Sequence, residues 1–82
     1  MTAKKIKNRL LECASHMCFD YNGIDCGVDP FYIPEERKIC FNMWYGENTV
    51  HTARDIDEVM TMKFFGGKSL DEIADTVEIT EW

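Results

Sequence analysis

The segment HMCFDYNGIDCGV, residues 16–28, alternates polar and apolar side chains on both sides of an Asn-Gly pair. Such a pair between alternating residues strongly indicates a β-hairpin, because a two-residue type I′ turn needs two residues at positive φ. A turn at Asn22-Gly23 predicts an apolar face built from three cross-strand pairs: Tyr21 with Ile24, Phe19 with Cys26, and Met17 with Val28. The opposite face holds the remaining side chains, which are His16, Cys18, Asp20, Asp25, Gly27 and Asp29. A register shift of one residue would exchange the two faces, so their clean separation supports this pairing.

Two more strands are predicted downstream of the hairpin. Prolines at positions 30 and 34 predict a loop over residues 29–37. The segment KICFNMWY, residues 38–45, alternates again and predicts a third strand, with Gly46-Glu47 as a two-residue turn into a fourth strand over residues 48–53. This turn predicts three further pairs: Asn42 with His51, Met43 with Val50, and Trp44 with Thr49.

Helical patterns flank the predicted strands. The first helix is expected from about Ala3 to Ser15, where apolar side chains recur at helical spacing: Ile6, Leu10, Cys13 and Met17, with Leu11 and Ala14 beside them. Two short helices are expected later, because two pairs of residues have the spacing of capping boxes: Asp55 with Glu58, and Ser69 with Glu72.

The end of the chain is expected to complete the core. Gly66-Gly67 should end the helix that Asp55 begins, and Phe64-Phe65 should anchor it in the core. The last segment, EITEW at residues 78–82, reads as a short closing strand or a tail, with Ile79 and Trp82 docked on the body.

These patterns together predict one domain, residues 1–82, of the α+β class. Its expected architecture is an antiparallel sheet of three to four strands, with an N-terminal helix and two short C-terminal helices on one face. The basic and then amphipathic N-terminus has neither a continuous apolar run nor a cleavage site of small residues, so we expect a cytoplasmic protein. Disulfides are rare in that compartment, and four cysteines therefore suggest buried thiols, a metal site or redox chemistry.

The proposed registers gather two cysteines and two histidines on the polar sheet face, namely His16, Cys18, Cys40 and His51. This is the ligand set of a structural zinc site, and a chain this small would gain folding free energy from such a site. The spacing lacks a C-x-x-C motif, and Cys13 or Cys26 remain alternative ligands. The competing interpretation is four reduced thiols without a metal.

Catalysis is not expected. Cys40, Asn42 and His51 have the residue types of a cysteine-nucleophile triad, but an open sheet face offers no pocket that excludes water. The sequence also lacks a glycine-rich phosphate loop, an H-E-x-x-H motif and a G-x-S-x-G elbow.

The net charge of −6 comes entirely from the last third of the chain. Residues 55–82 hold eight acidic side chains against Lys63 and Lys68, which disfavours contact with a phosphate backbone and suits a basic protein surface. Trp44, on the polar strand face, is the expected binding hot spot, with Tyr45 and the aromatic residues Phe31 and Tyr32 nearby. The alternative is that Trp44 packs on the loop at residues 29–37 and forms a second small core.

In size, acidity and compact mixed fold, the chain resembles the small proteins of phages and mobile elements, among them the anti-CRISPR proteins. The resemblance lies in the acidic side chains Asp55, Asp57, Glu58, Asp71, Glu72, Asp75, Glu78 and Glu81. It implies an inhibitor that covers a nucleic-acid-binding surface, for example on a CRISPR-associated nuclease, with all of these acidic residues except Glu81 joining Trp44 in the contact. Two alternatives remain open: a thiol or redox protein that uses Cys18 or Cys40, and a regulatory subunit that pairs through a sheet edge. The protein is expected to be a monomer or a weak homodimer.

Overall fold

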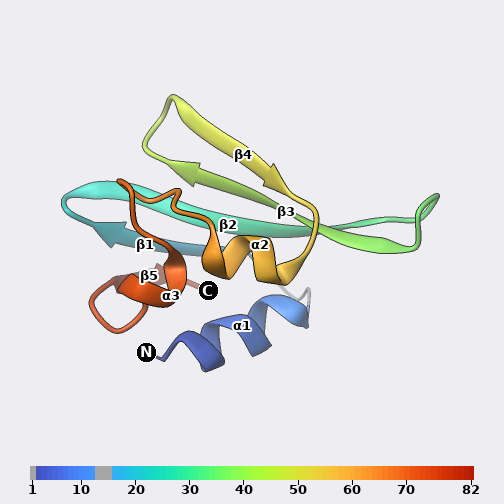
Figure 1. The fold of residues 1–82 in the computed structure, drawn as a ribbon, viewed down its shortest axis with the longest axis horizontal. Coiled ribbons are helices and arrows are strands. Elements are labelled where there is room, and N and C mark those ends of the chain that lie inside the picture. The colour runs from blue at the N-terminus through green and yellow to red at the C-terminus, as the bar shows by residue number, and fades with distance from the viewer. Residues whose placement is uncertain (1, 13–15) are drawn as a thin grey trace.

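A computed structural model of the chain describes residues 2–12 and 16–82. The elements follow in the order α1 (Ala3–Leu11), β1 (Met17–Tyr21), β2 (Ile24–Ile33), β3 (Lys38–Tyr45), β4 (Thr49–Ala53), α2 (Ile56–Thr61), α3 (Leu70–Ile73) and β5 (Glu78–Glu81). The strands form one antiparallel sheet in the order β4-β3-β2-β1-β5, and the helices lie on one side of it (Figure 1). The predicted α+β class is therefore confirmed, with five strands in place of three or four.

The β1–β2 hairpin forms in the predicted register. Asn22 and Gly23 have φ values of 55° and 74°, as a type I′ turn requires, and Phe19 lies opposite Cys26. The apolar face of this hairpin turns toward the helices, where Met17, Phe19 and Cys26 are fully buried.

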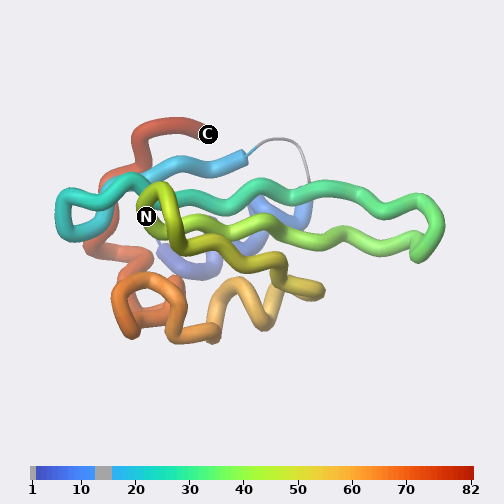
Figure 2. Tube along the Cα trace, turned by 90° about the horizontal axis from the view of Figure 1, so that it is seen from above, coloured from blue at the N-terminus to red at the C-terminus, as the bar shows by residue number. Residues whose placement is uncertain are grey.

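The loop predicted over residues 29–37 is wrong, because β2 continues through Pro30 to Ile33 and only residues 34–37 form the turn. The hairpin geometry explains how a strand tolerates this proline. Tyr21 and Ile24 flank a two-residue turn, so every second residue of β2 from Ile24 onward directs its N–H toward β1. β1 begins at Met17, opposite Val28, and the N–H that Pro30 lacks would point beyond this first residue of β1. The result is a two-stranded arm, residues 31–40, that extends beyond the other strands (Figures 1 and 2).

The predicted β3–β4 register is wrong by one residue. Gly46 donates its N–H to the Asp25 carbonyl at 2.8 Å and so continues the contact of β3 with β2. With a φ of 72°, Gly46 is the first residue of a three-residue turn, 46–48. His51 consequently lies opposite Met43 and not opposite Asn42. Because paired residues share a face, the shift moves His51 to the side covered by helices.

The helices are shorter than predicted. α1 ends at Leu11, whose side chain is 45% exposed, while the predicted continuation through Cys13 and Ser15 lies outside the described residues. α2 ends at Thr61, ahead of the glycine pair that was expected to terminate it.

Gly66 and Gly67 form instead a tight turn, in which Phe65 and Lys68 pair through two backbone hydrogen bonds. This turn carries Phe65 into the core, as predicted for the Phe64-Phe65 pair. The predicted docking of Ile79 and Trp82 against the core is also confirmed. No helix among the described residues is long and apolar enough to cross a lipid bilayer.

Helix α3 has only four residues and depends on its N-terminal cap. The Ser69 hydroxyl accepts the N–H of Glu72, and the Glu72 carboxylate accepts the N–H of Ser69 in return. The ammonium group of Lys63, together with this backbone N–H, lowers the pKa of Glu72 to about 2.

The Glu72 carboxylate is therefore expected to stabilise the fold in a pH-dependent way. Its folded pKa lies below the ordinary value of 4.5, so its contribution is present above that pH and is lost as the pH falls toward 2. Glu72→Gln should reduce the free energy of unfolding at pH 7, with a progressively smaller difference from the wild type between pH 4.5 and 2. Urea unfolding at several pH values measures this difference, and Lys63→Met shows whether the lysine is its source. An equal loss at pH 7 and pH 2 would contradict the assignment.

Candidate functional site: the open face of the sheet

One face of the sheet carries no helix within the described residues, and we call it the open face (Figure 2). In Figure 2 the strands lie side by side in front and α1 lies behind them. The strand registers place the following side chains on the open face: Cys18, Asp20, Asp25, Gly27, Asp29, Phe31, Ile33, Lys38, Cys40, Asn42, Trp44, Val50, Thr52, Glu78 and Glu81.

The open face carries an excess of negative charge. Five carboxylates lie on the open face and are exposed, namely Asp20, Asp25, Asp29, Glu78 and Glu81. Lys38 is the only lysine or arginine at a strand position of this face in the part of the chain that the structure describes. Four of the nine basic residues lie instead on α1, behind the sheet: Lys4, Lys5, Lys7 and Arg9. The open face is therefore strongly acidic although residues 1–54 are balanced in charge.

Trp44 lies against Gly27 on this face. The two residues are opposite each other on β2 and β3, and a Cβ atom at position 27 would overlap the six-membered ring of the indole. On its other side Trp44 pairs with Val50 of β4, whose side chain is 72% exposed. The alternative prediction, that Trp44 packs on a loop at residues 29–37, is wrong because that segment is mainly strand and Trp44 lies on Gly27.

An open groove of about 550 Å³ runs along β3 and β4 beside the indole. It is lined by the open-face side chains of Asn42, Trp44, Val50 and Thr52, together with Met43 and His51, which lie between them on the strands and direct their side chains to the helix side. Among these lining residues, the Thr52 hydroxyl donates a hydrogen bond of 2.9 Å to the side-chain oxygen of Asn42. The groove thus combines an aromatic wall, an exposed valine and polar groups.

A second cluster lies at the opposite edge of the open face, where β1 meets β5. His16 Nε2 is 3.0 Å from Glu81 Oε1, and with Cys18 Sγ all three potential ligand atoms lie within 4.8 Å of one another. Glu81 lies opposite Cys18 because the β1–β5 register shifts between Cys18 and Phe19. We call these three residues the β1–β5 cluster.

The predicted zinc set of His16, Cys18, Cys40 and His51 does not come together. His51 points to the helix side, where its Nε2 lies 2.5 Å from the Glu58 carboxylate. Cys40 is on the open face but two strands and four residues away from Cys18, roughly 16 Å by strand geometry, and only 2% of it is exposed. Only the pair from the first strand, His16 and Cys18, keeps its predicted proximity. The alternative ligand Cys26 is fully buried on the helix side, and Cys13 lies outside the described residues.

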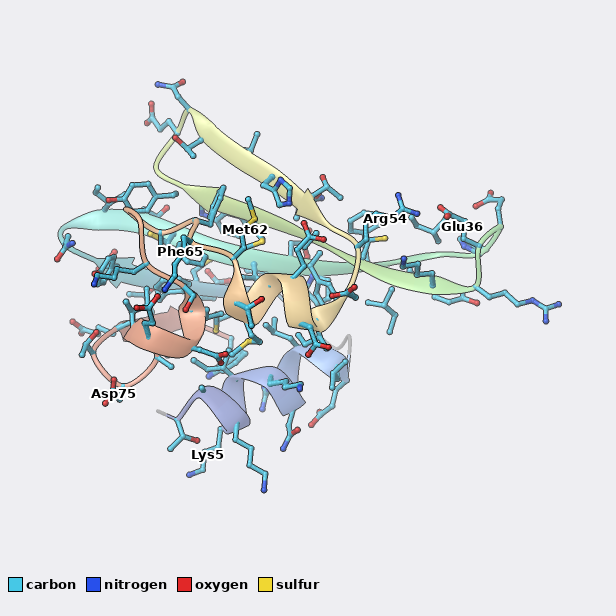
Figure 3. The ribbon with its side chains drawn as sticks, viewed as in Figure 1. Lys5, Glu36, Arg54, Met62, Phe65 and Asp75 are labelled. Carbon is cyan, nitrogen blue, oxygen red and sulfur yellow. The ribbon has the colours of Figure 1, made fainter. Side chains whose placement is uncertain are left out.

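The acidic residues predicted to bind a partner are divided between the two sides of the sheet. Glu78 lies on the open face with Trp44, whereas Asp55, Asp57, Glu58, Asp71, Glu72 and Asp75 belong to the helix layer. In Figure 3 Lys5 and Asp75 both point away from the sheet on that side.

Several of these helix-layer carboxylates have local partners. Asp55 caps α2, Asp57 pairs with Lys7 at 3.5 Å, and Glu72 pairs with Lys63. The hydrogen bond from His51, followed by the N–H of Arg54, lowers the pKa of Glu58.

The thiols described by the structure are reduced. Burial raises the pKa of Cys26 to about 11. Burial also raises the pKa of Cys18, and the nearby carboxylates of Glu81, Asp25 and Asp29 act in the same direction. A redox-active thiol needs a lowered pKa and electropositive surroundings, and the surroundings of Cys18 are the reverse.

The acidity of the open face was partly visible in the sequence. Asp20, Asp25 and Asp29 fall on the polar side of the predicted hairpin, but the balanced charge of residues 1–54 gives no sign that this side is acidic. Glu81 had no such signal, because its position depends on a register shift between β1 and β5.

Comparison with known proteins adds no family assignment. No family model matches the chain, and no curated protein or solved structure shows significant similarity to it.

Proposed function

We propose that the protein is a non-enzymatic binding protein that docks its open face on a basic surface of a larger protein. The observation that carries the proposal is the unbalanced negative charge of the open face, whose strand positions hold five exposed carboxylates and one lysine. On the helix side, the carboxylates of α2 and α3 lie on the same side as the basic residues of α1, and Asp57 and Glu72 pair with Lys7 and Lys63. Complementary charge accelerates association and favours partners of opposite sign. A phosphate backbone would be repelled by this face.

The groove beside Trp44 supplies the contact that charge alone does not. Exposed carboxylates at a rim contribute mainly to the rate of association, whereas a tryptophan at the centre of an interface is a typical source of affinity. Trp44 and Val50 lie at the β4 side of the open face, and Asp25 and Asp29 flank Gly27 beside the indole. A partner seated on this face would therefore meet apolar and acidic groups together.

The partner class that fits best is a basic surface that ordinarily holds nucleic acid. Such a surface matches an acidic face in charge, and its occupation would inhibit the partner. CRISPR-associated nucleases in the cytoplasm are the first candidates, in keeping with the general resemblance to anti-CRISPR proteins. Inhibition of this kind requires only binding through the acidic face and the groove, without a catalytic step.

Charge reversal on each side of the sheet tests the proposal. Binding to a panel of purified nucleic-acid-binding proteins, RNA-guided nucleases first, is measured with and without their nucleic acid. For a partner found in this way, the double variant Asp25→Lys/Asp29→Lys should weaken binding at least about tenfold, and raising the salt from ~50 to ~300 mM should also weaken it. Prior occupation of the partner by nucleic acid should prevent the interaction.

The matched control is Asp71→Lys/Asp75→Lys, which reverses the same charge in the helix layer. It should leave affinity nearly unchanged. Binding that this control abolishes, or that is insensitive to both salt and the open-face variant, would refute the docking of the open face.

A further inference from the structure

We infer that His16 Nε2, Cys18 Sγ and the Glu81 carboxylate form a binding site for one zinc ion, or a similar divalent transition metal, at the β1–β5 edge of the open face. The site is distinct from the groove at Trp44, which lies at the other edge of the sheet, and it does not depend on the proposed docking function.

The donor set matches borderline-soft metals. Imidazole nitrogen, thiolate sulfur and carboxylate oxygen are all zinc ligands, and a nitrogen and sulfur pair disfavours magnesium or calcium. In a tetrahedral zinc site, metal–ligand distances of about 2.0–2.3 Å place ligand atoms roughly 3.5 Å apart. The three atoms already lie within 4.8 Å of one another, and the His16 and Glu81 side chains are half-exposed, so small rotations complete the geometry. Three protein ligands leave the fourth position to water.

The register shift in β5 is the second observation that points to this site. Asp20 pairs with Glu78 and Phe19 with Ile79, so a regular ladder would pair Cys18 with Thr80 and Met17 with Glu81. Glu81 would then face the core beside the fully buried Met17, where an unpaired carboxylate is costly. The shift places Glu81 opposite Cys18 instead, on the same face as His16. Irregularities of this kind often redirect a side chain next to a functional site.

The surroundings also favour a cation. Asp25 and Asp29 flank Gly27, the residue opposite Cys18, and share its face. None of the ion pairs formed by the described residues involves these two aspartates. A divalent ion in the β1–β5 cluster would therefore lie near three carboxylates, counting Glu81. Cys18 would bind as the thiolate and release its proton to solvent.

Metal binding is expected to stabilise the C-terminal strand β5 against local unfolding. β5 has four residues and lies at the edge of the sheet, held on one side by β1 alone. A metal shared by His16 and Cys18, at the start of β1, and Glu81, at the end of β5, would join the two strands where their ladder is irregular. Amide exchange in β5 should therefore slow when the metal binds.

Titration of the full-length protein with Zn²⁺ and with Co²⁺ tests the site. One equivalent of Co²⁺ should bind and produce a thiolate-to-cobalt charge-transfer band, which Zn²⁺ then removes. Cys18→Ser should abolish the band. His16→Gln and Glu81→Gln should each weaken Zn²⁺ binding by at least ~10–100-fold, the loss typical of mutating a residue that only hydrogen-bonds a metal ligand. The band should persist in Cys13→Ser, which excludes the other cysteine near His16 in the sequence.

The matched controls substitute a cysteine, a histidine and a glutamate that lie outside the β1–β5 cluster. Cys40→Ser, His51→Gln and Glu78→Gln should retain the band, the stoichiometry and the affinity. Hydrogen exchange with and without Zn²⁺ gives a readout that needs no variant, with slower exchange expected at residues 78–81. A band that survives Cys18→Ser, a loss confined to the control variants, unchanged exchange in β5, or the absence of stoichiometric binding by the wild type would each overturn the site.

Discussion

Phe65→Ala is expected to lower the free energy of unfolding by about 3–5 kcal/mol, the usual cost of removing a fully buried phenylalanine ring. The Phe65 side chain is completely buried, and its ring lies edge-on to Phe19 at 5.3 Å, Tyr45 at 6.5 Å and Phe64 at 5.1 Å between centroids. Phe65 lies in the connection between α2 and α3, where Figure 3 labels it. A domain of this size has roughly 4–12 kcal/mol of stability in total, so one substitution removes a large part of it.

Thermal unfolding followed by circular dichroism measures the effect, and the midpoint should fall by more than about 12 °C. Tyr32→Ala is the matched aromatic control, because Tyr32 is 55% exposed and its loss should cost less than about 1 kcal/mol. Similar midpoints for the two variants would show that the α2–α3 connection is not anchored through Phe65.

The features predictable from the sequence were those that depend on local rules. Asn22-Gly23 specifies a two-residue turn by its backbone preference, and the alternation around it then determines every pair of the first hairpin. The Ser69 cap is equally local. These elements need no information about what packs against them, so the sequence pattern was sufficient.

The wrong predictions concern features that depend on neighbouring strands. Pro30 normally argues against a strand, but the N–H that it lacks would point beyond Met17, the first residue of β1, and no residue near Pro30 indicates where β1 begins. Likewise Gly46 lengthens the β3–β4 turn because its N–H contacts Asp25 of β2. Both errors concern contacts with a neighbouring strand, which local sequence patterns do not report.

The candidate sites follow the same division. His16 and Cys18 lie together as predicted, because they are two residues apart where the chain enters β1. His51 was lost from the metal set by a turn that is one residue longer than expected, and Glu81 entered by a register shift that sequence alternation does not report. Because strand faces alternate with every residue, a shift of one position is enough to exchange one metal ligand for another.

Gly27→Ala is expected to displace the Trp44 indole and with it the wall of the groove. A Cβ atom at position 27 would overlap the indole ring, and the alternatives to moving the ring are backbone shifts costing about 1–3 kcal/mol. The indole of Trp44 therefore lies in space that only a glycine at position 27 leaves free, and even the methyl group of alanine should displace the ring. In a Trp82→Phe background, where Trp44 is the remaining tryptophan, its fluorescence emission should shift to longer wavelength as the ring enters solvent.

The same variant should reduce binding to a partner by about 30-fold or more, the effect of losing a hot spot worth at least ~2 kcal/mol. Val50→Ala provides the comparison, because it shortens an exposed side chain on the other side of the indole without touching its seat on Gly27. It should leave the emission unchanged and weaken binding only modestly. Emission and affinity that both stay at wild-type values in Gly27→Ala would mean that the indole tolerates the methyl group in place, and that affinity arises elsewhere on the open face. A red-shifted emission with unchanged affinity would show that Trp44 packs on Gly27 in the wild type but does not contribute to binding of the partner.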